Sequence, residues 1–136
     1  MMNRNKKGIA LNLKDKEGIE IFKTMIKNSD VVLENFRKGT LEKLGIGYDT
    51  ISKINPKIIL CEISGYGRTG PYANKGGFDL VAQGMSGLMS ITGEDKNKPP
   101  MKVGAPLTDI TAGLLAASGI LAALIHRDKT GEGQKV

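Results

Sequence analysis

The stretch that decides the fold is Pro106-Leu-Thr-Asp-Ile-Thr-Ala-Gly-Leu-Leu-Ala-Ala-Ser-Gly-Ile-Leu-Ala-Ala-Leu-Ile-His126. It predicts a long helix of mostly small apolar residues, because it contains no charged side chain from Ile110 to Ile125. A helix that is apolar on every face is expected to be buried in the core. Its one acid, Asp109, lies in the first turn, where free N–H groups and the helix dipole favour negative charge. Asp109 is therefore a candidate anionic nucleophile, and the alternative is that it only caps the helix.

The length and composition of the chain are those of one globular domain or of part of one. The chain has 136 residues and a mass of 14.6 kDa, and 40% of its residues are hydrophobic. A net charge of +6 favours anionic partners, but the basic residues are spread out and the chain has no Trp. Stacking on nucleic acid is therefore disfavoured, and a small polyanionic ligand suits the charge.

Neither a membrane span nor a secreted location is expected. The charge-free part of the predicted helix, about 16 residues, is shorter than the ~20 needed to cross a bilayer. The short apolar run Ile9–Leu11 is not the core of a signal peptide. The single cysteine, Cys61, has no partner for an intramolecular disulfide, which favours a reduced cytoplasmic setting. Because Cys61 lies in an apolar run, we expect a small core residue rather than a nucleophile.

The remaining segments alternate strands and helices. Apolar periodicity and turn residues predict strands at 8–13, 30–35 and 57–63, and helices at 15–27, 40–44, 48–54 and 78–90. Lys135-Val136 indicates the start of a further strand. This order predicts an α/β fold: a Rossmann-like parallel sheet with flanking helices and right-handed crossovers.

A glycine-rich loop, Ser64-Gly-Tyr-Gly-Arg-Thr-Gly-Pro71, follows the third predicted strand. Ligands of open α/β sheets bind at the carboxyl ends of the strands, so this loop is a candidate edge of a site. It lacks the Gly-Lys-Ser/Thr of a phosphate-binding P-loop, and no predicted helix begins at its last glycine. A functional loop and a flexible turn both remain open at this point.

Several stretches of the chain follow one another in an ordered series: Asn3–Lys6, Val32–Arg37 with Gly39, Leu44–Tyr48, Ile63–Pro71, Gly77–Asp79, Gly104–Asp109 and Arg127–Gln134. This series resembles the family III CoA-transferases, the CaiB/BaiF group. The group includes formyl-CoA and carnitine-CoA transferases and the related 2-methylacyl-CoA racemases. The resemblance covers nearly all of the chain.

The resemblance implies an enzyme that moves CoA from an acyl-CoA donor to a carboxylic acid acceptor. Asp109 matches the family's nucleophilic aspartate, which forms a mixed anhydride and then an aspartyl-CoA thioester. Asp79 matches an acidic position where a second carboxylate assists catalysis, and the alternative is a helix N-terminal acid. The positions that fall at or beside CoA contacts of relatives are Lys14, Asn35, Phe36, Arg37 and Lys43. CoA and acyl-CoA are expected as substrates, with no tightly bound cofactor and no metal.

The family pattern also bears on assembly and on competing activities. Family chains have about 400 residues and interlock as homodimers, so residues 1–136 are expected to be part of the Rossmann-like large domain. One alternative is racemase- or dehydratase-like chemistry on acyl-CoA, and another is an inactive truncated fragment. Phe78 stands where racemases carry the His of Gly-His-Asp, and phenylalanine cannot transfer a proton, which favours CoA transfer. A generic Rossmann-like oxidoreductase is disfavoured because no glycine-rich turn follows the first predicted strand.

Overall fold

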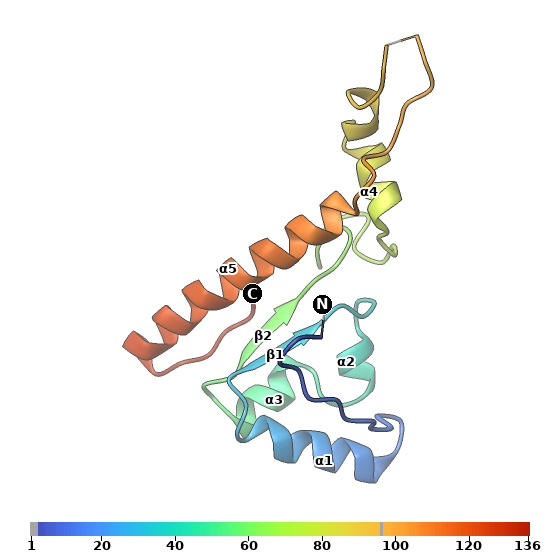
Figure 1. The fold of residues 1–136 in the computed structure, drawn as a ribbon. Coiled ribbons are helices and arrows are strands. Elements are labelled where there is room, and N and C mark those ends of the chain that lie inside the picture. Colours follow the sequence, from blue (N-terminus) through green and yellow to red (C-terminus); the bar gives the residue numbers. More distant parts are fainter. Residues whose placement is uncertain (1–2, 96) are drawn as a thin grey trace.

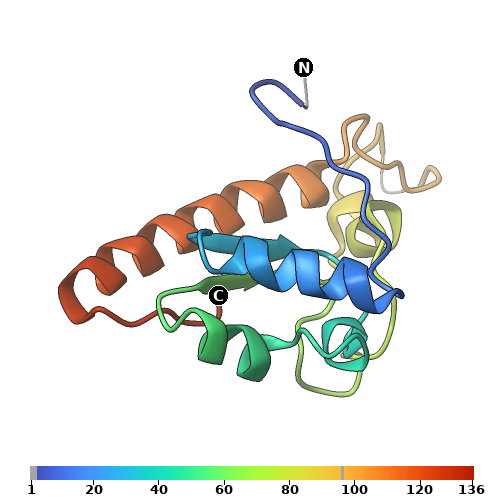
Figure 2. The same ribbon diagram turned by 90° about the horizontal axis from the view of Figure 1, so that it is seen from below.

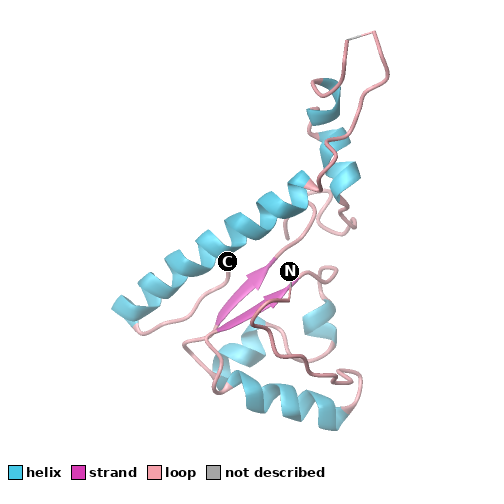
Figure 3. Ribbon diagram, in the orientation of Figure 1, coloured by secondary structure: helices cyan, strands magenta, loops and turns pink. Residues whose placement is uncertain are grey.

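The computed structural model describes residues 3–95 and 97–136; the remaining three residues lie outside the described part. The fold is α/β, with two strands between helices, as the sequence predicts (Figures 1 and 3). Strand β1 (Val31–Glu34) pairs in parallel with β2 (Ile59–Glu62), and the register sets Glu34 opposite Glu62. Both strands therefore end in a carboxylate at the same edge of the sheet.

The last residues of the chain extend the sheet on the other side of β2. Leu60 N–H donates to the Gln134 carbonyl at 3.0 Å, and Val136 N–H donates to the Leu60 carbonyl at 2.8 Å. A parallel bridge joins Leu60 and Lys135. This pairing confirms the strand predicted to start at Lys135, and Figure 2 shows the chain returning beside the strands after its long helix.

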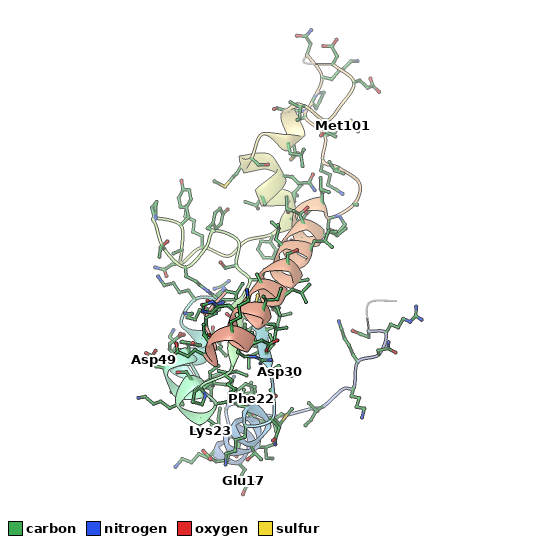
Figure 4. The ribbon with its side chains drawn as sticks, turned by 90° about the vertical axis from the view of Figure 1, so that its left-hand side faces the viewer. Glu17, Phe22, Lys23, Asp30, Asp49 and Met101 are labelled. Atoms are coloured by element: carbon green, nitrogen blue, oxygen red, sulfur yellow. The ribbon has the colours of Figure 1, made fainter. Side chains whose placement is uncertain are left out.

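The helices lie on both sides of the strands. The described helices are α1 (Lys16–Ile26), α2 (Thr40–Lys43), α3 (Tyr48–Ile54), α4 (Asp79–Met85), the 3₁₀ helix η1 (Leu88–Ser90) and α5 (Leu107–Thr130). Figure 1 shows α1, α2 and α3 on one side of the strands and α5 on the other. The segment with α4 and η1 extends away from the sheet, and Figure 4 shows Met101 far from the labelled α1 residues.

The hydrophobic core lies between the sheet and the first three helices. Asp15 begins α1 as predicted, since its Oδ1 accepts the Glu17 N–H at 2.8 Å. Of the apolar residues of α1, Ile26 is in the core and Ile19 and Phe22 pack against it. The buried side chains of the core cluster are Ile26, Leu41, Ile46, Ile51, Ile58 and Leu60. Cys61 is buried in β2, in agreement with its prediction as a core residue.

Three expected elements differ from the structure. The strand predicted at 8–13 is wrong: these residues have no strand partner in the described part of the chain, and Ile9 is exposed. The predicted helix at 78–90 is two elements, because Gly87 adopts a left-handed φ of 79° and breaks it. The long helix continues past His126 to Thr130, where Gly131 at φ 81° ends it.

The predicted burial of α5 is also wrong for this chain. Only Ala123 is buried along it, whereas Leu114 and Leu115 are 65% and 67% exposed. The described sheet is narrow, so it contacts one face of α5 and leaves the other apolar face uncovered. By length and composition α5 would also suffice to cross a membrane, with a mean hydropathy of 1.7 over its most apolar window. Core helices of soluble proteins meet the same criterion, so this is weak evidence for a span.

Candidate active site

The carboxyl ends of β1 and β2 are joined by one arginine of the glycine-rich loop. Arg68 pairs through Nη2 with Glu34 Oε1, and its Nε lies 3.5 Å from Glu62 Oε1. Arg68 Nη1 also donates to the Phe36 carbonyl at 3.3 Å. On the other side of Glu62, Lys135 Nζ lies 2.9 Å from Oε2. Two carboxylates and two cations therefore fix the loop to the sheet edge.

Burial dominates the electrostatics of this cluster. It raises the pKa of Glu34, and the Phe36 N–H and the Arg68 charge partly oppose that shift. Glu34 Oε2 accepts the Phe36 N–H at 2.6 Å, so the same carboxylate positions the residues that follow β1. Burial, followed by the Glu34 and Glu62 charges, raises the pKa of Cys61. The Cys61 thiol is thus kept protonated, which does not suit a nucleophile.

The glycine-rich loop crosses the segment before α4 at two glycines in backbone contact. A Cβ added to Gly65 would lie 2.8 Å from the backbone nitrogen of Gly77, and closer still to its Cα. Only two residues without side chains can approach in this way. The crossing therefore fixes the spacing between the loop and Asp79.

This crossing makes a prediction that a matched glycine can control. Gly65→Ala should destabilise the chain by roughly 1–3 kcal/mol, the usual cost of overpacking, because two backbone segments must separate. Gly76→Ala is the control, since a Cβ there meets nothing within 4 Å. Urea unfolding midpoints of the two variants provide the measurement. Equal midpoints would show that the crossing is not tight in solution.

The first turn of α5 is held by Asp79 of α4. Asp79 Oδ1 accepts hydrogen bonds from the Thr108 N–H at 2.9 Å and the Thr108 hydroxyl at 2.6 Å. Its Oδ2 accepts from Gln83 Nε2 at 2.7 Å. Asp109 is the next residue after Thr108, so the contact places it at the same helix mouth.

Low pH should weaken the hydrogen bonds between Asp79 and Thr108. The Thr108 hydroxyl has the largest effect on the pKa of Asp79 and lowers it. Burial, the next largest effect, raises this pKa, and the Thr108 N–H, Gln83 and the Asp109 N–H lower it, so that the net shift is downward. A carboxyl whose pKa is lower in the folded state than in the unfolded state stabilises the folded state at pH values above its unfolded pKa. This stabilisation is lost as pH falls through the folded-state pKa. As pH falls below the usual pKa of an aspartate, the Thr108 and Asp109 amides should therefore lose protection, measured as their exchange rate relative to the intrinsic rate at each pH. Asp79→Asn should remove this pH dependence when exchange is followed by NMR.

The Asp109 side chain opens on a cavity at the carboxyl ends of the strands. The cavity has a volume of about 640 Å³ and is formed by the segments after β1 and β2, the start of α4 and the start of α5. Asp109 is exposed and shares this cavity with the loop residues Ser64, Gly65, Tyr66 and Arg68. Asp109 and the glycine-rich loop therefore line the same cavity, as the sequence led us to expect.

The other predicted positions divide into two groups. Asn35, Phe36 and Arg37 line the cavity together with Asp79. Lys14 and Lys43 are not among the lining residues; they lie in the turn before α1 and at the end of α2. Their contact with CoA stays a prediction.

The cavity also has cations that the sequence reasoning missed, namely Lys38, Arg68 and Lys75. Lys75 Nζ lies 4.0 Å from the centre of the Tyr72 ring. Arg37 and Lys38 are exposed and form no ion pair with the described residues. The sequence contains a signal for Lys38, because this residue follows Arg37 in the segment directly after a predicted strand, where ligands of parallel sheets bind. Among residues 3–95 and 97–136, no cluster of three His, Cys, Asp or Glu side chains could hold a metal ion.

Comparisons with known proteins show the family of the chain. The family model described as CoA-transferase family III matches residues 1–136. The succinate–glutarate CoA-transferase of Agrobacterium fabrum is 46% identical over 134 residues, which are 98% of this chain and 33% of that protein. The human succinyl-CoA:glutarate CoA-transferase is 47% identical over 132 residues, 97% of this chain and 30% of that protein.

The fold also matches that of a solved structure. The crystal structure of a CaiB/BaiF family protein from Brucella suis matches with a TM-score of 0.95 and 42% identity, over 98% of this chain and 35% of that one. This chain thus spans about a third of the length of the relatives that it matches. The fold, the ordered motifs and the match over residues 1–136 establish that the chain belongs to CoA-transferase family III.

Proposed function

We propose that this chain carries the nucleophile and part of the CoA site of a CoA-transferase. The observation that carries the proposal is the position of Asp109, which lines one cavity with the glycine-rich loop and with Arg37. A carboxylate there has access to a thioester carbonyl, and a cation without an ion pair in the described chain is available for a phosphate.

The proposed reaction needs no external oxidant and no net proton. An Asp109 oxygen attacks the acyl carbon of the donor thioester, the C–S bond breaks, and CoA leaves as thiolate with a mixed anhydride at Asp109. The thiolate attacks the aspartyl carbonyl and releases the donor acid as a carboxylate. The acceptor carboxylate then displaces CoA from the aspartyl thioester, and the thiolate attacks the new acyl group. Asp109 is regenerated when the product acyl-CoA leaves.

The names of the relatives suggest a substrate class. The two transferases described above are named for succinate or succinyl-CoA and glutarate, which are four- and five-carbon dicarboxylic acids. We propose a dicarboxylic acid acceptor for this chain as well. The basic residues Lys38 and Lys75, which line the cavity, support a doubly charged substrate.

Racemisation is the second candidate function. A proton-carrying side chain next to Asp79 would favour racemisation. The residue at that position is Phe78, which lines the cavity, is 72% exposed and cannot carry a proton. Solvent deuterium entering the α-carbon of an acyl-CoA without exchange of CoA between acids would support racemisation. CoA exchange without deuterium uptake would support transfer.

The decisive experiment joins this chain to the remainder of a related enzyme. A chimera would carry residues 1–136 in place of the matching third of the Agrobacterium fabrum transferase. We expect it to exchange CoA between succinyl-CoA and glutarate, and borohydride added during turnover should trap Asp109. A folded chimera without a trapped aspartate would contradict the mechanism. Titration of CoA into the 136-residue chain tests the inactive-fragment alternative, which predicts no saturable heat.

A further inference from the structure

The helix that carries Asp109 begins without a cap of its own. Its N-cap residue is Pro106, which forms no side-chain capping hydrogen bond. The first-turn N–H groups of a helix have no partner within that helix, so they need one from outside. For Thr108 that partner is Asp79, which lies 29 residues earlier on α4.

Asp79 is itself held by a buried amide. Gln83 is fully buried, and its Nε2 donates to Asp79 Oδ2 while its Oε1 accepts the Val103 N–H at 2.8 Å. Both polar atoms of the amide are thus used, one by the carboxylate and one by the segment that leads into α5. Because the Val103 N–H can only donate, the amide orientation that presents Nε2 to Asp79 is the favoured one.

These contacts do not suit a second catalytic base. Both oxygens of Asp79 already accept hydrogen bonds, and its pKa is lowered chiefly by the Thr108 hydroxyl. A carboxylate in this state is a poor proton acceptor and a good fixed anchor. Asp79 therefore acts through its hydrogen bonds to Thr108, the residue before Asp109, rather than through its basicity.

We propose that Gln83 and Asp79 are positioning residues, which hold the first turn of α5 and so place Asp109 against the glycine-rich loop. This inference rests on the proposed function in giving Asp109 the role of nucleophile. A displacement of about 1 Å at a reacting group is enough to cost ~10²-fold in rate, so an external anchor matters at an uncapped helix start.

The test exchanges the two side chains without changing the number of hydrogen bonds. Asp79→Asn sets two amide donors against each other, and Gln83→Glu sets two carboxylates against each other. In the double variant Asp79→Asn with Gln83→Glu, the new amide donates to the new carboxylate, which still accepts the Val103 N–H. The 136-residue chain is used, and hydrogen exchange of the Thr108 and Asp109 amides is measured by NMR.

We expect each single change to speed exchange of these two amides about tenfold or more, since a lost hydrogen bond of about 1–2 kcal/mol corresponds to that factor. The double variant should restore exchange to within about threefold of the parent. Asp49→Asn, at an exposed first-turn acid of α3, is the control and should change nothing at α5. A double variant no better than the faster-exchanging single would overturn the proposal.

A milder pair of variants covers the case in which buried changes prevent folding. Thr108→Val removes the 2.6 Å hydroxyl bond to Asp79, whereas Thr111→Val changes an exposed threonine one turn later. Only the first should speed exchange of the Asp109 amide, and equal effects would contradict the proposal. None of these readouts needs CoA. A failure of the CoA-transfer proposal would instead appear as a missing aspartyl intermediate with amide exchange as expected.

Discussion

Replacing Asp109 with alanine is expected to lower CoA transfer by the chimera roughly 10⁴-fold or more, the usual loss when a covalent nucleophile is removed. The reason is that, among the described residues, the other carboxylate lining the cavity is that of Asp79, and both of its oxygens already accept hydrogen bonds. The measurement is the rate of CoA exchange between succinyl-CoA and glutarate, together with borohydride trapping.

The matched control for this change lies on the same helix. Asp128→Ala removes an exposed acid near the other end of α5, outside the cavity that holds Asp109. We expect its rate to stay within about twofold of the parent, because surface changes are usually small. If Asp109→Ala kept more than about a tenth of the parent rate, another nucleophile would have to be sought.

The second large effect is expected at Arg68. Arg68→Met should lower the free energy of unfolding by roughly 3 kcal/mol at neutral pH, because it leaves the Glu34 carboxylate buried beside Glu62 without its cation. This value lies at the low end for buried pairs, since the Arg68 side chain keeps 20% of its exposure. Urea unfolding at pH 7 gives the measurement. Arg37→Met, an exposed cavity arginine without an ion pair in the described chain, should change stability by less than about 0.5 kcal/mol.

The pH dependence of the Arg68 variant separates charge from packing. The pKa of Glu34 is already raised by burial, and removal of the guanidinium should raise it further. A carboxyl whose pKa is higher in the folded state destabilises that state when ionised, so the loss should shrink as pH falls through the folded pKa. Adding Glu34→Gln to Arg68→Met should recover part of the loss at pH 7. A loss independent of pH would mean that the alkyl stem, rather than the charge, supplies the stability.

Much of the fold follows from local pattern. The strands predicted at 30–35 and 57–63 contain β1 and β2, and the Asp15 cap of α1 is present, because short apolar runs and caps act over a few residues. The predicted strand at 8–13 fails because alternation creates a strand only where a neighbour supplies a ladder of hydrogen bonds. Burial of α5 fails for a similar reason, since an apolar surface is covered only where other residues reach it.

The residues that line the candidate site can be predicted from the sequence, whereas the long-range contacts that hold them in place cannot. Residues after parallel strands meet at one sheet edge, so the shared cavity of Asn35–Arg37 and the loop after β2 is expected from chain order. The pairing of Arg68 with Glu34, 34 residues away, has no local signal. The bond from Val103 to Gln83 likewise joins residues 20 positions apart.

The amino-acid sequence alone determined the order of strands and helices, the acid at the mouth of the long helix and the kinship with the transferases, because these depend on residue type and spacing. Tertiary structure alone decided which groups hold that acid in place: Asp79 and Gln83 at the helix start, and Arg68 at the strand ends. The physical reason is that hydrogen bonds and ion pairs act over about 3–4 Å. Distant residues reach that range only after the crossovers have brought them together.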